Sequence, residues 1–182
     1  MPHFMAGGWT AEMLPALPDD GNRYEVIDGE LYVSPSPLTV HQAVALQLAA
    51  VLLGYLKPSR IAAVIPDIDV TVDERTMVRP DIVVAPFVSG KLPERPVDAR
   101  TLLLVVEILS PSSLRLDRRE KRALYARVAV PEYWIVDIDG QTIERWRAGT
   151  DIPELFRDRM TWQPDPSKAA LVIELGELFA GT

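Results

Sequence analysis

Two short aliphatic segments decide the fold: RPDIVVA at 79–85 and LLLVVEIL at 102–109. Nearly continuous runs of this kind are typical of strands that are buried on both faces of a sheet. We therefore predict strands over 78–85 and 102–109, lying side by side at the centre of one sheet. Each segment holds a single carboxylate, Asp81 in the first and Glu107 in the second.

These two carboxylates indicate a binding site for a hard cation. A carboxylate in or beside a buried strand is costly unless it is paired, hydrogen-bonded or bound to a metal. A basic segment that carries Lys121 follows the second strand. Few oxygen ligands suit Mg²⁺, which keeps several of its waters and leaves room for a phosphate.

The segment 114–128 has the spacing of a helix that packs on the sheet. At 3.6 residues per turn, Asp117 and Lys121 share a stripe with apolar residues. The apolar members of this stripe are Leu114, Leu124, Tyr125 and Val128, while Arg118, Arg119 and Arg122 lie outside its centre. Two interpretations of Lys121 remain: a pair with Asp117, or an ammonium group beside Glu107 that orients a water or balances charge on a phosphate.

Composition predicts one domain over residues 1–182. The chain has 48% hydrophobic residues and no cysteine, which excludes disulfides and thiolate chemistry. The longest apolar stretch, 43–56, is too short and too interrupted to span a bilayer. The N-terminus shows no basic region followed by an apolar run, so we expect no signal peptide, no membrane partner and a cytoplasmic location.

The charge distribution is uneven. A net charge of −7 argues against a protein that coats nucleic acid. The segment 115–127 nevertheless carries six basic residues against two acidic ones, so it is net +4 and the remainder is net −11. Either this segment is a solvated basic helix face, or it meets phosphates.

Other elements follow from local patterns. The Asp28-Gly29 pair predicts a two-residue turn between strands 24–27 and 30–33. A long helix is expected over 40–56, capped by Thr39, and a strand over 61–72. The expected core face of that helix comprises Val40, Val44, Leu48, Val51, Leu52 and Tyr55.

Several motifs together resemble the Uma-type restriction endonuclease family of the PD-(D/E)xK nuclease superfamily. They are Pro80-Asp81, EILSPS at 107–112, Lys121 with Tyr125, EYWIVD at 132–137, and the opening YEVIDGE at 24–30 with Ser36-Pro37 and His41. The resemblance covers residues 22–147. It implies an α+β, restriction-endonuclease-like domain with an αβββαβ core, in which helices flank a mixed central sheet.

The resemblance also implies roles for matching residues. Asp81 and Glu107 would bind Mg²⁺ or Mn²⁺ together with the backbone carbonyl of Ile108. Leu109 stands where the superfamily pattern places its lysine, and Lys121 from the following helix would replace that lysine. His41 and Glu25 are secondary candidates, with a surface or capping histidine and a strand-face charge as the alternatives.

The implied function is a magnesium-dependent DNA endonuclease that hydrolyses phosphodiester bonds. Arg118, Arg119 and Arg122 would meet DNA phosphates, which position a substrate without reading its sequence. Cleavage of a duplex needs one site per strand, which favours a homodimer. Two alternatives are a nuclease fold without catalysis that binds DNA or protein, and a metal-dependent hydrolase of a small phosphoester.

Overall fold

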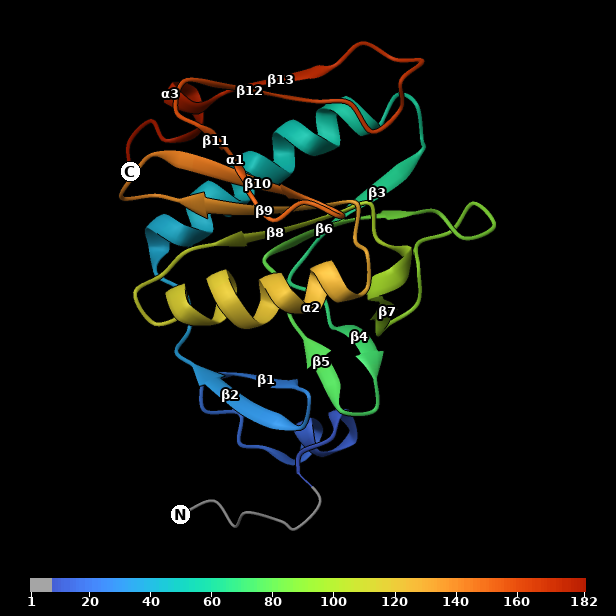
Figure 1. The fold of residues 1–182 in the computed structure, drawn as a ribbon, viewed down its shortest axis with the longest axis vertical. Helices are drawn as coiled ribbons and strands as arrows, with labels where there is room; N and C mark the ends of the chain where they lie inside the picture. Colours follow the sequence, from blue (N-terminus) through green and yellow to red (C-terminus); the bar gives the residue numbers. More distant parts are fainter. Residues whose placement is uncertain (1–7) are drawn as a thin grey trace.

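The computed structural model describes residues 8–182, which form a six-stranded sheet, a five-stranded sheet and a two-stranded hairpin (Figure 1). The six-stranded sheet has the order β11-β10-β9-β8-β6-β3. Its strands are β3 (Ala62–Pro66), β6 (Ile82–Pro86), β8 (Leu104–Ile108), β9 (Glu132–Asp137), β10 (Thr142–Arg147) and β11 (Glu154–Phe156). Only β8 and β9 are parallel, so the central sheet is mixed, as predicted.

The five-stranded sheet lies below the central sheet in Figure 1 and has the order β2-β1-β5-β4-β7. Its strands are β1 (Arg23–Ile27), β2 (Glu30–Ser34), β4 (Val70–Asp73), β5 (Thr76–Val78) and β7 (Val97–Asp98). Beside the two longer helices described below, the shorter elements are the helices η1 (Ala11–Ala16), η2 (Ala99–Thr101) and α3 (Leu175–Leu178), and the hairpin of β12 (Arg159–Trp162) and β13 (Leu171–Glu174).

Alternating residues of the central strands supply two separate cores, which explains their continuous apolar sequences. In β8, Leu104 and Val106 pack in the core that includes α1 (Thr39–Leu56) and the C-terminal hairpin. Val105 points the other way, into the core shared with the second helix and the five-stranded sheet. Glu107 is two residues beyond Val105, so its side chain enters this second side.

The helix that follows β8 contains a π-helical turn. Its two parts are η3 (Leu116–Lys121), which is π-helical, and α2 (Arg122–Arg127); Figure 1 draws them as one long helix in front of the central sheet. The wider turn brings Leu116 into the core, whereas Leu114 is 46% exposed. The predicted stripe was therefore wrong at Leu114, because the sequence-based spacing assumed 3.6 residues per turn throughout.

Two predicted strands are in fact divided between the two sheets. Within 78–85, residue 78 ends β5, and β6 begins only at Ile82. Within 61–72, β3 and β4 belong to different sheets. Asp67 separates β3 from β4 with φ of 48°, in the left-handed region where a chain turns. Pro66-Asp67 and Pro80-Asp81 stand at the two changes of sheet, with apolar residues on either side.

The predicted hairpin is confirmed. Ile27 pairs with Glu30, and the intervening Asp28 and Gly29 have φ of 51° and 83°, as a type I′ turn requires. Arg127, the last residue of α2, donates to both carboxylate oxygens of Asp28 at 2.9 and 2.8 Å. This ion pair joins the hairpin to the helix on which Lys121 lies.

Helix α1 differs from the prediction at its start and on its buried face. It begins at Thr39, with Leu38 as the N-cap residue and no side-chain cap, so Thr39 does not cap it. Its buried residues are His41, Val44, Leu48, Leu52 and Leu56, while Val40 and Val51 are exposed. By length and composition alone α1 could cross a membrane, but in this structure it packs on the central sheet.

The packing of α1 predicts unequal effects of two leucine substitutions. Leu48 is completely buried and Leu46 is 72% exposed. Leu48→Ala should lower the free energy of unfolding by about 2–5 kcal/mol, because it leaves a cavity. Leu46→Ala should change it by less than about 0.5 kcal/mol. Urea unfolding of both variants provides the measurement, and equal losses would contradict this packing.

Candidate active site

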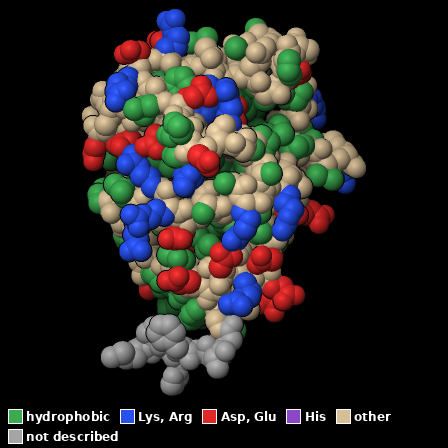
Figure 2. All heavy atoms as spheres, in the orientation of Figure 1, with side chains coloured by type: hydrophobic (Ala, Val, Ile, Leu, Met, Phe, Trp, Pro, Cys, Tyr) green, Lys and Arg blue, Asp and Glu red, His purple; other side chains and the backbone are tan. Residues whose placement is uncertain are grey.

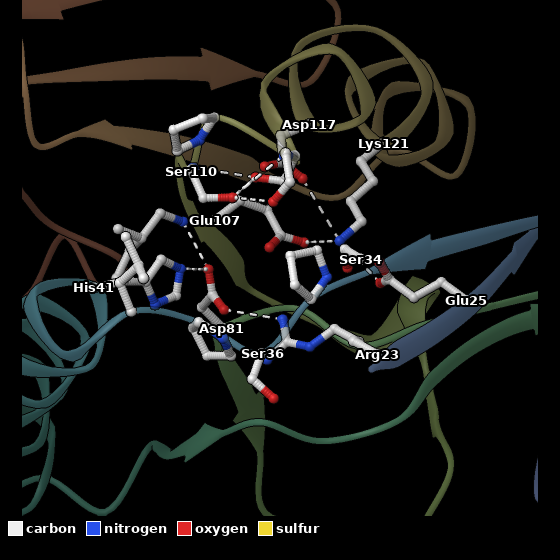
Figure 3. A pocket seen from close by; sticks show the side chains of 17 residues that line it. Arg23, Glu25, Ser34, Ser36, His41, Asp81, Glu107, Ser110, Asp117 and Lys121 are labelled. Atoms are coloured by element: carbon white, nitrogen blue, oxygen red, sulfur yellow. Dashed lines mark hydrogen bonds and ion pairs between the residues drawn. The ribbon is translucent and has the colours of Figure 1, made fainter. Parts of the chain in front are cut away.

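Four acidic side chains from different parts of the chain converge on a cavity of about 300 Å³ (Figure 3). Glu25 comes from β1, Glu107 from β8, Asp117 from the π-helical turn, and Asp81 from the residue before β6. The cavity therefore lies where the central sheet, the five-stranded sheet and the helix meet. All four carboxylates are buried.

Strand pairing places Asp81 opposite Glu107. Strands β6 and β8 are antiparallel and pair Ile82 with Val106. One further step in that register brings Asp81 across from Glu107, and alternation points both side chains to the same face. The predicted central adjacency of these two segments is confirmed.

Both carboxylate oxygens of Asp81 have protein partners. Oδ1 accepts a hydrogen bond from Arg23 Nη1 at 3.1 Å. Oδ2 accepts from the N–H of Ile108 at 2.8 Å and lies 3.1 Å from His41 Nε2. Burial raises the pKa of Asp81, but contact with His41, the charge of Arg23 and the Ile108 N–H outweigh it and hold that pKa below its ordinary value.

Lys121 is enclosed by carboxylates. Its Nζ lies 2.9 Å from Glu107 Oε1, 2.9 Å from Glu25 Oε1 and 3.6 Å from Asp117 Oδ1, and its side chain is 2% exposed. Both sequence-based interpretations thus describe real neighbours, and Glu107 is closer than Asp117. Burial lowers the pKa of Lys121, but the three carboxylates outweigh it and raise that pKa well above its ordinary value.

The acids around Lys121 compete for its single charge. Burial raises the pKa of Glu107 well above its ordinary value, Lys121 lowers it, and the neighbouring acids Asp117, Asp81 and Glu25 raise it again. Burial likewise raises the pKa of Asp117 to about 6, against the opposing effect of Lys121. Asp117 Oδ1 is buried, and within residues 8–182 it accepts no hydrogen bond.

The two secondary candidates both reach the site. His41, in the first turn of α1, is buried beside Asp81, so it is neither a surface nor a capping residue. Glu25 faces Lys121, and its Oε1 also accepts from the N–H of Arg79 at 2.6 Å. Sequence alone could not separate these residues from ordinary polar ones, because their partners lie far away in the chain.

Arg23 and a group of serines also line the cavity, although they are absent from the residues predicted from the sequence. Arg23 begins β1, and alternation places it on the same face as Glu25. Ser110 and Ser113 exchange hydrogen bonds between backbone N–H and hydroxyl at 3.2 Å in both directions, where the helix begins. A basic residue at a strand end gives no sequence signal of its own.

The three arginines predicted to meet DNA lie outside the cavity lining. Figure 2 shows that Lys and Arg side chains on the face that carries α2 are interspersed with Asp and Glu side chains. Arg118 donates to Glu144 at 2.6 Å and to Asp137 at 3.3 Å. The guanidinium of Arg122 lies 4.5 Å from the centre of the Trp146 ring. Arg119 is exposed, and it makes no ion pair with the residues that the structure describes.

The donor set fits a hard divalent cation. Four carboxylates line the cavity against the two basic side chains of Arg23 and Lys121, so the lining is rich in oxygen ligands. Glu107 Oε2 accepts no hydrogen bond from any described residue, and Ile108, whose N–H donates to Asp81, also lines the cavity. Within residues 8–182, no group of three or more acidic or histidine side chains is arranged so that it could hold a metal ion by itself. Two carboxylates, a carbonyl and waters suit Mg²⁺ or Mn²⁺.

Known proteins share this architecture. A family model described as "Uma2: Putative restriction endonuclease" matches residues 11–176. A solved structure titled as "a putative nuclease belonging to DUF820 from Anabaena variabilis" superposes with a TM-score of 0.76 at 22% sequence identity, over 94% of this chain and 98% of that chain. At that identity the likeness concerns the fold. No match was found among curated proteins.

The mixed central sheet flanked by helices defines an α+β protein, and the structure from Anabaena variabilis has the same fold. The family model covers most of the chain. The chain therefore belongs to the Uma2 family, as its motifs predicted.

The raised pKa of Asp117 predicts a pH-dependent stability. In the folded state this pKa is about 6, against an ordinary value of 3.8. The stability that comes from its bound proton is present below pH 3.8 and is lost as pH rises through 6. Asn cannot titrate, so Asp117→Asn lacks this loss. As pH rises from 3.8 to 6, the unfolding free energy of the variant should therefore increase by up to about 3 kcal/mol relative to that of the parent.

Urea unfolding at several pH values, without added metal, measures this difference. Asp139→Asn, an exposed substitution outside the cavity, should follow the parent at every pH. A constant difference between Asp117→Asn and the parent would show that Asp117 keeps an ordinary pKa.

Proposed function

We propose that this protein is a divalent-metal-dependent DNA endonuclease that hydrolyses phosphodiester bonds. The observation that carries the proposal is the convergence of Asp81 and Glu107 at the ends of adjacent strands, beside Lys121, in a cavity open enough for a phosphate. Membership of a family described as "Putative restriction endonuclease" supports the same reaction.

In this proposal Asp81, Glu107 and the Ile108 carbonyl hold the cation, which is Mg²⁺ or Mn²⁺. A cation bound there would polarise a phosphoryl oxygen and make a water more acidic. Lys121 fixes one oxygen of Glu107, so the other oxygen stays free to act as a ligand. In the hydrolysis, the oxygen of a water molecule bonds to phosphorus and one phosphorus–oxygen bond of the DNA backbone breaks. The protons of the water end on the two product oxygens or in solvent.

The remaining roles of the basic residues are also proposals. Arg119 is exposed and can bind a DNA phosphate directly. To bind a phosphate, Arg118 would give up its contact with Glu144, and Arg122 would give up its contact with Trp146. We further propose that a single domain carries the activity, that it works in the cytoplasm without a membrane partner, and that two copies act on a duplex.

A second candidate function is a nuclease fold that binds DNA or protein without catalysis. Two observations favour it. Asp81 already has Arg23, His41 and Ile108 as partners, so its oxygens would be shared between these partners and a metal ion. Leu109, buried in an apolar cluster at the superfamily's lysine position, favours it too.

Cleavage of plasmid DNA distinguishes the two candidates. The endonuclease proposal expects nicked or linear products with Mg²⁺ or Mn²⁺, and none with a chelator. Glu107→Gln, purified in parallel, should give no products, which excludes a contaminating nuclease. A parent protein that binds DNA but never cuts it would favour the binding module.

Metal binding can be measured separately by calorimetry with Mn²⁺. Asp81→Asn and Glu107→Gln should each weaken binding by at least ~100-fold, because each removes a charged ligand. Glu144→Gln breaks an ion pair with Arg118 away from the cavity and should bind Mn²⁺ like the parent. Parent-like binding by Glu107→Gln would contradict the ligand assignment.

Lys121→Met tests the lysine. It should lower cleavage by about 100-fold, the scale of losing a contact that orients a metal ligand, because Glu107 is then no longer fixed, while Mn²⁺ binding stays within a few-fold of the parent. Because removing one partner of a buried ion pair can cost about 3–5 kcal/mol, thermal unfolding with Mn²⁺ present should establish that the variant is folded. Cleavage at the parent rate would remove Lys121 from the proposed machinery.

A further inference from the structure

We infer that Arg23 is the side chain of this site that binds the substrate's phosphate group. The inference rests on the proposed function and adds a residue to it. Arg23 projects from β1 into the cavity that holds Asp81 and Glu107, and Figure 3 shows its guanidinium directed at Asp81. A phosphodiester monoanion is the ligand that its charge and shape would recognise.

The position of Lys121 gives the first reason. Arg23 and Lys121 are the Lys and Arg side chains that line the cavity. Three carboxylates surround the ammonium of Lys121, and its side chain is 2% exposed. The side chain of Arg23 is 17% exposed. A phosphate that enters the cavity therefore meets the guanidinium of Arg23, while Lys121 is occupied by its carboxylates.

The hydrogen bonds of Arg23 give the second reason. Nη1 donates to the carbonyl of Arg79 at 3.0 Å and to Asp81 at 3.1 Å, and Nη2 donates to Asp67 at 3.0 Å. A guanidinium has five N–H donors. Nε and the second Nη2 hydrogen have no partner among residues 8–182. Arg23 is thus anchored on two sides and still has donors for phosphate oxygens.

Charge balance gives the third reason. Asp81 is the buried counter-ion of Arg23, and the other acidic partner, Asp67, is largely exposed. When Asp81 serves as a ligand to a divalent cation, its charge no longer balances Arg23. Arg23 stays in place through Asp67 and the Arg79 carbonyl, so a phosphate anion can take over as counter-ion. Metal and phosphate should therefore each strengthen the binding of the other.

Arg23→Gln separates this role from a structural one. Without DNA, the variant should bind Mn²⁺ several-fold more tightly than the parent in calorimetry, because a cation beside Asp81 is removed. The Mn²⁺-loaded variant should bind a short, hydrolysis-resistant phosphorothioate duplex about tenfold more weakly in fluorescence anisotropy, since a charged hydrogen-bond donor is lost. A merely structural role would weaken both.

Two further variants complete the test. Arg159→Gln makes the same charge change at an exposed ion pair with Glu174 and should match the parent in both measurements. Arg23→Lys keeps the positive charge beside Asp81 but loses the forked donors, so it should leave Mn²⁺ binding near that of the parent and still weaken duplex binding. This second variant decides the matter if Arg23→Gln does not fold.

The outcomes distinguish this inference from the proposed function. A parent that binds neither Mn²⁺ nor the duplex overturns both. A parent that binds both, with Arg23→Gln unchanged in duplex affinity or weaker in Mn²⁺ affinity, overturns the role of Arg23 alone. Tighter Mn²⁺ binding together with weaker duplex binding supports it.

Discussion

The enclosure of the Lys121 ammonium among three buried carboxylates is the interaction on which the site depends. Burying an ionised group is costly unless it is paired, and here one cation serves several acids at once. That arrangement requires β1, β8 and the helix to meet at one point. The Arg127–Asp28 ion pair fixes the helix to the hairpin of the five-stranded sheet, and Arg118 fixes it to the central sheet. The helix is therefore in contact with both sheets on either side of the acids.

The π-helical turn lets the same helix bury Lys121 among the carboxylates and pack an apolar side chain in the core. It begins with Leu116 and Asp117 and ends at Lys121, and all three are buried. A uniform helix with Asp117 and Lys121 on its inner face would direct Leu114 inward as well. The wider turn puts Leu116 there instead and leaves Leu114 partly in solvent. The same local irregularity thus serves the apolar core and the polar site.

The sequence predicts what depends on local periodicity, and less of what depends on distant contacts. The aliphatic runs identified β6 and β8, and the Asp28-Gly29 pair identified the hairpin. The predictions of 61–72 and 78–85 as single strands ran across Pro66-Asp67 and Pro80-Asp81, where the chain passes between the sheets, because apolar residues stand on both sides of each pair. Arg23 could not be predicted: its importance comes from Asp81, 58 residues away, and no spacing rule joins them.

Under the proposed function, Lys121 supplies from the helix the ammonium that the superfamily pattern places at Leu109. Leu109 is two residues beyond Glu107, so a lysine there would share the face of Glu107. In this chain Leu109 packs in the apolar core, and the ammonium reaches Glu107 from the helix. Because Lys121 reaches Glu107 from the helix, its ammonium also lies beside Glu25 and Asp117, and these carboxylates enclose its charge. An enclosed ammonium can organise the acids but cannot also face a substrate, so the cavity needs a second cation, and Arg23 is the one at hand.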